Sequence, residues 1–296
     1  MFTRAARAII PSAAAAVPQN ARGMATLQEM KRRIESVSNM AKITSSMKMV
    51  SAAKLRRAED AMKPAMAYGK ASAALPELVG EPEEKPETRL VVAISSDKGL
   101  CGAANSVIAR EAIAIMEEDK AAGVQTVIAN VGDKARATLT AKGVEVEHGF
   151  SEFGKSAFSF AQAAYIADIL LNEVEFDIAT IVHNEFVNVI TYNTVRKSVL
   201  GPEKMAEQTS AALGHYNMRG DRHLMENYAS FHLANAIFSG AREAAAVEFA
   251  QRMSAMDSAS TNAKDMIERL ELQYNRTRQA VITTELCEII GGMSAL

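Results

Sequence analysis

The feature that most constrains this fold is a run of apolar and small residues near the C-terminus, spaced alternately four and three positions apart. The run covers more than four heptads, a pattern typical of a helix that packs along a second helix. Helix signals begin near Leu224, and Gly291-Gly292 predicts the helix end. About 68 residues at ~1.5 Å each would span roughly 100 Å. The members of this C-terminal seam are Phe249, Met253, Met256, Ser260, Ala263, Ile267, Leu270, Tyr274, Thr277 and Val281.

A second long helix is predicted near the N-terminus, because residues from Leu27 to about Met62 include neither glycine nor proline. Thr26 and Glu29 form a capping box that we expect to begin this helix, and the helix signals weaken at Pro64. Such a helix is too long and too polar to lie inside a globule. We therefore expect an antiparallel coiled coil with the C-terminal helix. The N-terminal seam comprises Leu27, Met30, Ile34, Val37, Ala41 and Thr44, and is expected to continue with a shifted phase through Met47 and Val50.

The middle of the chain alternates short apolar runs with helical stretches, which predicts a parallel sheet covered by helices. The last two strands are separated by two residues, which indicates an antiparallel hairpin at the edge of the sheet. Expected strands are Leu90–Ile94, Val124–Val131, Val144–Glu147, Ile178–His183 and Phe186–Val195, and expected helices are one ending near Ala122, Asp133–Lys142 and Ala157–Glu173.

The predicted fold class is α/β: a long antiparallel coiled coil of the N- and C-terminal helices plus a Rossmann-like α/β domain. The predicted segments are a leader at 1–24, the N-terminal coiled-coil helix at 25–75, an acidic, proline-rich linker at 76–88, the α/β domain at 89–200, a second linker at 201–220 and the C-terminal helix at 221–296.

The first 24 residues resemble a mitochondrial transit peptide, because they carry Arg4, Arg7 and Arg22 but no acidic residue. Cleavage is expected before Ala25. No stretch reaches the roughly 18 apolar residues of a membrane span.

The two cysteines, Cys101 and Cys287, form no C-x-x-C pattern and indicate free thiols in a reducing compartment. The five histidines show no ligand spacing, so no metal, cofactor or catalytic site is predicted. Gly99 and Gly102 lack the spacing of a dinucleotide-binding turn and predict a tight turn instead.

One segment does resemble a catalytic motif: residues Gly149 to Ser156 satisfy the phosphate-loop pattern G-x-x-x-x-G-K-S. Against a nucleotide site, the preceding strand alternates like an exposed edge, and Phe150 and Phe153 are bulky for a loop that wraps a triphosphate. No later apolar strand ends in an aspartate that could hold magnesium. A stand-alone nucleotide-binding α/β protein is kept as the alternative function.

The N-terminal helix is strongly basic between Lys31 and Arg57, with eight basic residues and one acid, Glu35. A nucleic-acid interface would pair such a helix with a dimeric zipper, whereas the partner helix here lies in the same chain. A cationic face that meets an acidic protein surface fits better than nucleic acid, and a merely solvated face is the third interpretation.

Three blocks of the sequence carry a resemblance: Arg33–Val37 with Lys42–Thr44 and Met47–Arg57, then Ser95–Gly102, then Arg252–Met256 with Asn262–Ala263, Tyr274–Ala280 and Ile282–Gly291. These blocks are similar to the γ-subunit family of F-type ATP synthases, and the absence of the chloroplast regulatory insert favours the mitochondrial branch.

The resemblance implies a non-catalytic rotor subunit that turns inside a hexamer of α and β subunits and drives each β subunit through its states. It implies δ, ε and the membrane c-ring as further partners, and the matrix side of the inner mitochondrial membrane as location. By position, it places contacts with β at Met47, Lys48, Arg278, Gln279, Thr283 and Glu285, and an apolar bearing tip at Ile289, Ile290, Met293 and Leu296.

Overall fold

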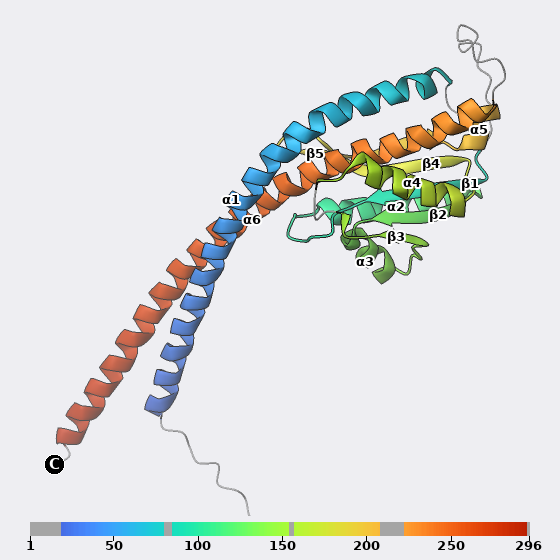
Figure 1. Cartoon of the computed structure of the whole chain (residues 1–296). Helices are drawn as coiled ribbons and strands as arrows, with labels where there is room; N and C mark the ends of the chain where they lie inside the picture. Colours follow the sequence, from blue (N-terminus) through green and yellow to red (C-terminus); the bar gives the residue numbers. More distant parts are fainter. Residues whose placement is uncertain (1–18, 80–84, 154–156, 208–221, 295–296) are drawn as a thin grey trace, which may run out of the picture. The chain divides into compact units, whose positions relative to one another are not determined.

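The computed structural model describes residues 19–79, 85–153, 157–207 and 222–294 (Figure 1). It divides into two compact units. The first, here the coil unit, comprises Met1–Ile43 and Ala259–Leu296, and the second, the domain unit, comprises Thr44–Ser258. Two long helices, α1 (Gln19–Val79) and α6 (Arg222–Ser294), contribute to both units. The predicted α/β class with a long helix at each end is therefore confirmed.

The domain unit contains a five-stranded sheet in the order β3-β2-β1-β4-β5. The first four strands in this order are parallel, and β5 is antiparallel to β4, as the sequence predicted. The strands are β1 (Thr88–Ile94), β2 (Gln125–Val131), β3 (His148–Phe150), β4 (Ile178–Phe186) and β5 (Tyr192–Leu200), and the helices between them are α2 (Ala104–Ala122), α3 (Asp133–Ala141) and α4 (Phe160–Glu173).

Two strand predictions were wrong in position. The strand expected at Val144–Glu147 lies at His148–Phe150. The apolar residue Val144, which suggested the strand, instead packs before it in the core cluster that α2 and α3 form with the sheet. The strand expected at Phe186–Val195 lies at Tyr192–Leu200, and Phe186 is instead the last residue of β4. The hairpin turn therefore covers residues 187–191 rather than two residues, since Phe186 pairs with Tyr192.

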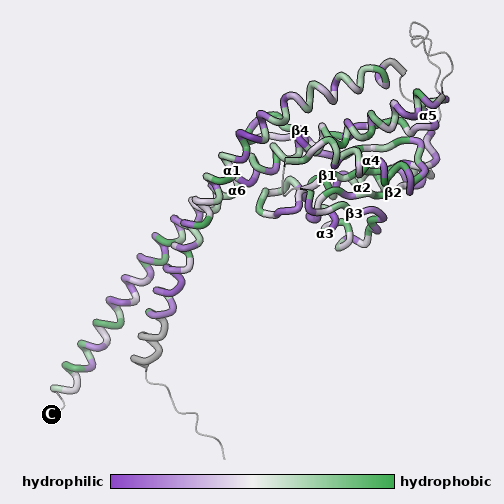
Figure 2. Tube along the Cα trace, viewed as in Figure 1, coloured by the Kyte–Doolittle hydropathy of each residue, from purple (hydrophilic) through white to green (hydrophobic). Residues whose placement is uncertain are grey.

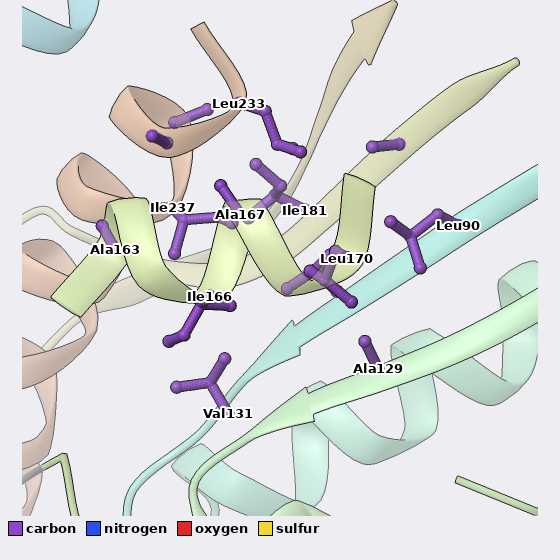
Figure 3. Close-up of a cluster of buried hydrophobic side chains, with 14 of the residues drawn as sticks. Leu90, Ala129, Val131, Ala163, Ile166, Ala167, Leu170, Ile181, Leu233 and Ile237 are labelled. Atoms are coloured by element: carbon purple, nitrogen blue, oxygen red, sulfur yellow. The ribbon is translucent and has the colours of Figure 1, made fainter. Parts of the chain in front are cut away.

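The larger core cluster packs α4 and α6 on one face of the sheet, while α2 and α3 cover the other face. Figure 3 shows Leu233 and Ile237 of α6, Ile166 and Leu170 of α4 and Ile181 of β4 gathered in this cluster. Strands covered on both faces read as nearly continuous apolar runs, which is the pattern of β1 and β2. Helix α6 is thus a structural part of the α/β core.

Helices α1 and α6 are antiparallel in the domain unit, because residues later in α1 meet residues earlier in α6. The helices approach closely at Gly69, where an added Cβ would lie 2.8 Å from Cβ of Ser239. Glycine allows this approach, and a larger side chain would push the helices apart. The contacts are Lys48 with Asp257, Lys54 with Phe249, Gly69 with Ser239 and Ser72 with Tyr228.

The predicted phase shift of the N-terminal seam was wrong. Val50 is 56% exposed, whereas Lys48 is half-buried and Ser51 is buried. The same alternation of three and four therefore continues along α1, since a one-residue shift would rotate the packed face by about 100°. Small residues at the seam permit close approach, so apolar size alone misled the prediction. The continued seam comprises Thr44, Lys48, Ser51, Leu55, Ala58, Met62, Ala65, Gly69 and Ser72, all buried or half-buried.

Helix α1 is also longer than predicted at both ends. It begins at Gln19, so Thr26 lies within the helix and the predicted capping box does not start it. It continues through Pro64 and Pro76 to Val79, into the predicted linker at 76–88. Pro64 is exposed, while Met62 and Ala65 beside it are buried against α6. Packing of the seam thus outweighs the roughly 3 kcal/mol cost of an interior proline.

Two other predicted breaks are helical. Gly291 and Gly292 do not end α6, which continues to Ser294. A short helix, α5 (Pro202–Glu207), lies in the linker predicted at 201–220, whose residues 208–220 fall outside the described part. At Gly291 and Gly292 the helix signals of neighbouring residues outweigh the local breaker, and Pro202 stands at the first position of α5, where proline favours a helix start.

Candidate functional site

The C-terminal part of α6, in the coil unit, exposes an apolar surface. Ile289 and Ile290 are each 60% exposed and Met293 is 67% exposed. Leu286 and Ile282 extend this surface by one and two helical turns, respectively. Figure 2 shows hydrophobic residues recurring along this part of α6. Three of the four residues predicted for the bearing tip are thus exposed, and the fourth, Leu296, lies outside the described residues.

The four polar residues predicted on α6 lie on one stretch of this helix. Arg278 and Gln279 are exposed, and so is Thr283, whose hydroxyl donates to the Gln279 carbonyl oxygen at 2.8 Å. Glu285 is half-buried. The side chains of Arg278 and Gln279 are therefore available to a partner, whereas the Thr283 hydroxyl is occupied by its own helix.

The two predicted residues of α1 have different surroundings. Met47 is half-buried beside the seam. Lys48 Nζ donates to Asp257 Oδ1 of α6 at 2.7 Å, with 43% and 55% of the two side chains exposed. The sequence assigned Lys48 to another subunit, but the structure brings it to an acid of its own chain. Its half-exposed side chain can still meet an external acid.

A contact that the sequence reasoning missed joins α6 to the β1–α2 loop. Arg252, 7% exposed, donates to the carbonyl oxygens of Gly99 at 3.2 Å and Lys98 at 3.4 Å. It also pairs with Glu248 at 2.6 Å. Burial raises the pKa of Glu248, and Arg252 opposes that shift. The contact joins two of the blocks that resemble the γ-subunit family, Ser95–Gly102 and Arg252–Met256.

The same loop surrounds a small cleft at the carboxyl ends of the strands. The cleft has a volume of about 70 Å³ and is lined by Ser96, Asn105, Asn184 and Glu248 among others. Ligands of open α/β sheets bind at such an edge, but nucleotide pockets measure roughly 300 Å³ or more. Asn105 already bonds to Ser96, and Asn184 to the Ala104 carbonyl. This cleft is too small and too internally bonded for a nucleotide.

The phosphate-loop motif does not gain support from the described residues around it. Gly149 lies within β3, and Arg136 packs against it, 3.2 Å from where a Cβ would stand. A phosphate loop leads straight into a helix N-terminus, whereas α4 begins at Phe160 behind its own cap, Ser159. Residues 154–156 of the motif lie outside the described part of the chain.

Within the described residues, no cluster of three or more His, Cys, Asp and Glu side chains could hold a metal ion. Among the same residues, no helix combines the length and apolar character needed to cross a membrane.

A family model described as ATP synthase matches residues 26–296. The chain is 41% identical over 276 residues to the mitochondrial ATP synthase F(1) complex subunit gamma of Rattus norvegicus, covering 92% of this chain and 100% of that protein. The chain belongs to the ATP synthase gamma-subunit family. It is also 39% identical over 312 residues to the mitochondrial ATP synthase subunit gamma of Drosophila melanogaster, covering 100% of each.

The fold agrees with that of solved members of this assembly. A chain of the Euglena gracilis mitochondrial ATP synthase, OSCP/F1/c-ring, rotational state 3, matches with a TM-score of 0.73 at 22% identity, covering 92% of this chain and 94% of that one. A chain of the Tetrahymena thermophila mitochondrial ATP synthase central stalk/c-ring matches with a TM-score of 0.62 at 24% identity, covering 74% and 99%. As a gamma-family member, the chain is a non-catalytic subunit, and the alternative of a nucleotide-binding protein has no support.

Proposed function

We propose that this chain is the rotating central-stalk subunit that couples rotation of a membrane ring to conformational cycling of catalytic β subunits. The observation that carries the proposal is the match to gamma subunits along the whole chain beyond the predicted leader. The long helices α1 and α6, each of which contributes to both units, support it, because a rotor needs extended and stiff elements.

The proposed mechanism needs differential contact. A rotor changes the relative free energies of β conformers only if it touches them differently at each angle. We assign these contacts to Met47 and Lys48 on α1 and to Arg278, Gln279, Thr283 and Glu285 on α6. The exposure of Arg278 and Gln279 supports this assignment.

The exposed apolar surface at the end of α6 fits a bearing. Burial of apolar surface is non-directional, so it holds the tip without favouring one angle. Directed hydrogen bonds would have to break at every step. We assign this role to Ile289, Ile290, Met293 and Leu296, of which the first three are exposed.

The proposed partners are the α and β subunits of the catalytic hexamer, the δ and ε subunits of the central stalk, and the c-ring. Residues 1–24 are proposed as a transit peptide cleaved before Ala25, close to residue 26, where the family match begins. The proposed location is the matrix side of the inner mitochondrial membrane.

The test replaces Arg278 by Ala in the assembled complex, with Arg269→Ala as a matched control on the same helix; both arginines are exposed. We expect Arg278→Ala to lower coupled ATP synthesis about fivefold, since truncating one interface arginine removes a large share of local contact energy. The control should change the rate little, and both variants should keep the same circular dichroism.

Unchanged synthesis in Arg278→Ala would remove this residue from the β contacts. The rotor assignment itself is tested by native electrophoresis of mitochondrial extracts, where the chain should migrate within a large ATPase complex. Migration of the chain alone would overturn the assignment.

A further inference from the structure

The end of α1, residues 65–79, packs on α6 through small residues, and we call this segment the strap. Only three residues between 65 and 77 are buried, whereas Leu55 and Met62 fill the same seam earlier in α1. The three are Ala65, Gly69 and Ser72. Such small residues contribute little apolar burial, and few buried apolar contacts are typical of a segment that opens locally.

The surface of α6 beneath the strap is polar. His232, Asn235 and Ser239 are all buried, and their spacing of three and four positions places them on one face of α6. Ser239 meets Gly69 of the strap, and the carbonyl oxygen of Ser72 faces His232. The closed strap therefore covers polar groups rather than an apolar surface.

Two of these polar groups have unpaired atoms while the strap is closed. Asn235 is 0% exposed, and neither its Nδ2 nor its Oδ1 has a hydrogen-bond partner within the described part of the chain. The same holds for Nδ1 of His232. A buried donor or acceptor without a partner loses the hydration that it has in water. Water would restore these hydrogen bonds if the strap moved away, so the covered groups favour opening.

The strap begins directly after Pro64, where α1 is weakest. Proline has no backbone N–H, so the helical hydrogen bond from residue 64 to the carbonyl oxygen of residue 60 cannot form. A helix of about 15 residues is marginal in water on its own. Gly69 and Pro76 weaken this one further. A strap that leaves α6 is therefore expected to unfold.

A few directional contacts hold the strap closed. Tyr68 of the strap lies edge-on to Phe231 of α6 and Phe160 of α4, with 6.2 and 6.4 Å between ring centroids. The Tyr228 hydroxyl of α6 donates to the Ser72 carbonyl oxygen at 2.7 Å. These contacts act against the hydration of the unpaired groups, so the closed and open arrangements differ little in free energy.

We propose that the strap is a hinged segment, which leaves α6 at Pro64, unfolds and closes again, and that acid favours the open arrangement through protonation of His232. Opening uncovers α6 between His232 and Ser239. The inference goes beyond the proposed function, because the device lies within the domain unit and needs no other subunit.

His232 makes the opening sensitive to pH. The groups that face it are the charged Lys197 of β5, the stacked Tyr228 ring of α6 and the Ser72 carbonyl oxygen of the strap. Burial, followed by the charge of Lys197, lowers the pKa of His232 to about 4, and the Ser72 carbonyl opposes this shift. Water returns the pKa to about 6.5 when the strap opens. Protonation therefore stabilises the open arrangement below about pH 6.5.

Hydrogen–deuterium exchange of the full-length chain, measured by mass spectrometry, tests the proposal, because exchange requires broken backbone hydrogen bonds. After correction for the intrinsic exchange rate at each pH, we expect the open fraction of residues 65–79 to be about tenfold higher at pH 5.5 than at pH 7.5. Residues 51–62 of the same helix, before the hinge, should show no such change.

Two histidine variants separate His232 from other titrating groups. His232→Gln should abolish the effect of pH on the strap. The matched control is His223→Gln, which removes an 89% exposed histidine of the same helix and should keep the wild-type effect.

Two further variants should act in opposite directions at pH 7.5. Gly69→Ala places a Cβ 2.8 Å from Cβ of Ser239, so it should raise the open fraction about tenfold, although alanine favours a helix. Asn235→Leu removes both unpaired atoms at similar volume, so it should lower the open fraction about tenfold.

Three results would overturn the strap. Residues 65–79 could exchange as slowly as the buried part of α6, the effect of pH could persist in His232→Gln, or Gly69→Ala could slow the exchange as helix propensity alone predicts. Because the measurement uses the chain alone, none of these results bears on the rotor assignment. Failure of that assignment appears instead in native electrophoresis, as migration of the chain outside an ATPase complex.

Discussion

Two parts of α6 share one heptad period but differ in their surroundings. In the domain unit, every residue from His232 to Ile237 is buried, because α1, α4 and the sheet surround this part. In the coil unit, every residue from Leu286 to Ser294 is exposed. One part of this helix is therefore packed into the core, and another part is exposed.

The difference in burial indicates which part of α6 stabilises the fold and which part is available to other proteins. Apolar residues between seam positions, such as Leu233 and Ile237, contribute burial to the embedded part. Residues of the same kind in the open part, such as Leu272 and Ile282, are 63% and 48% exposed. These exposed side chains contribute little burial free energy to the folding of this chain, so we expect them to contact other subunits.

The largest predicted effect contrasts isoleucines from the two parts. Ile237→Asp places an unpaired carboxylate at a site that is 0% exposed. We expect it to lower the free energy of unfolding by about 4 kcal/mol or more, through lost burial and desolvation of the acid. Ile282→Asp should change it by less than about 0.5 kcal/mol. Urea titrations of both full-length chains, followed by circular dichroism, measure the difference.

Ile237→Val provides a control that keeps the site apolar and should cost about 1 kcal/mol. Equal destabilisation by the two aspartates would mean that the open part of α6 is also buried in the free chain. That result would abolish the contrast on which the functional assignment of the exposed surface depends.

The period of the seam was the most predictive signal in the sequence. Phe249, Met256 and Ala263 are buried or half-buried as expected, because a 3-4 spacing keeps one face of a helix on its partner. The alternation of short apolar runs with helical stretches likewise predicted the parallel sheet, because it is also a periodic pattern of the sequence. The bearing tip was predicted from motif similarity alone; Ile289, Ile290 and Met293 of that set are exposed, and the bearing role stays a prediction.

The errors came from local signals that tertiary contacts outweigh. Pro64 and Gly291 are helix breakers in isolation, yet both lie inside helices. Lys48 and Ser51 occupy seam positions that a search for large apolar residues passes over. The Arg252 contact with Gly99 joins segments far apart in the sequence, and no spacing rule can find such a pair. The ring contacts of Phe160 with Tyr68 and Phe238 were missed likewise, because the rings come from three helices.

The second prediction concerns pH and the embedded part of α6. His232 is 4% exposed, and burial, with a smaller contribution from the charge of Lys197, lowers its pKa to about 4. The folded chain thus holds this histidine neutral, whereas the unfolded chain protonates it below about pH 6.5. Stability should be constant above that pH and fall between pH 6.5 and about 4, by about 1 kcal/mol per pH unit.

The measurement compares wild type with His232→Gln in urea titrations at pH 7.5, 6.5 and 5.5. The variant keeps a polar side chain but cannot titrate, so its loss of stability over this range should be smaller than that of wild type. His223, 89% exposed at the start of α6, provides the control: His223→Gln should follow the wild-type curve. Parallel curves for all three proteins would show that His232 is not buried in solution.

The smallest predicted effect on stability belongs to the ion pair of Lys48 and Asp257. Because both side chains are about half exposed, a double-mutant cycle with Lys48→Gln and Asp257→Asn should give a coupling free energy below about 1 kcal/mol. The ion pair matters for function more than for stability, because Lys48 can act either within the chain or on a β subunit.

The two single variants separate these roles in assays of coupled ATP synthesis. If Lys48 contacts an acidic surface of β, Lys48→Gln lowers the rate while Asp257→Asn leaves the cation free for that contact and preserves the rate. If Lys48 instead only ties α1 to α6, both variants lower the rate alike and the double variant adds nothing. We expect the first outcome, because a surface pair this weak can exchange one acid for another at little cost.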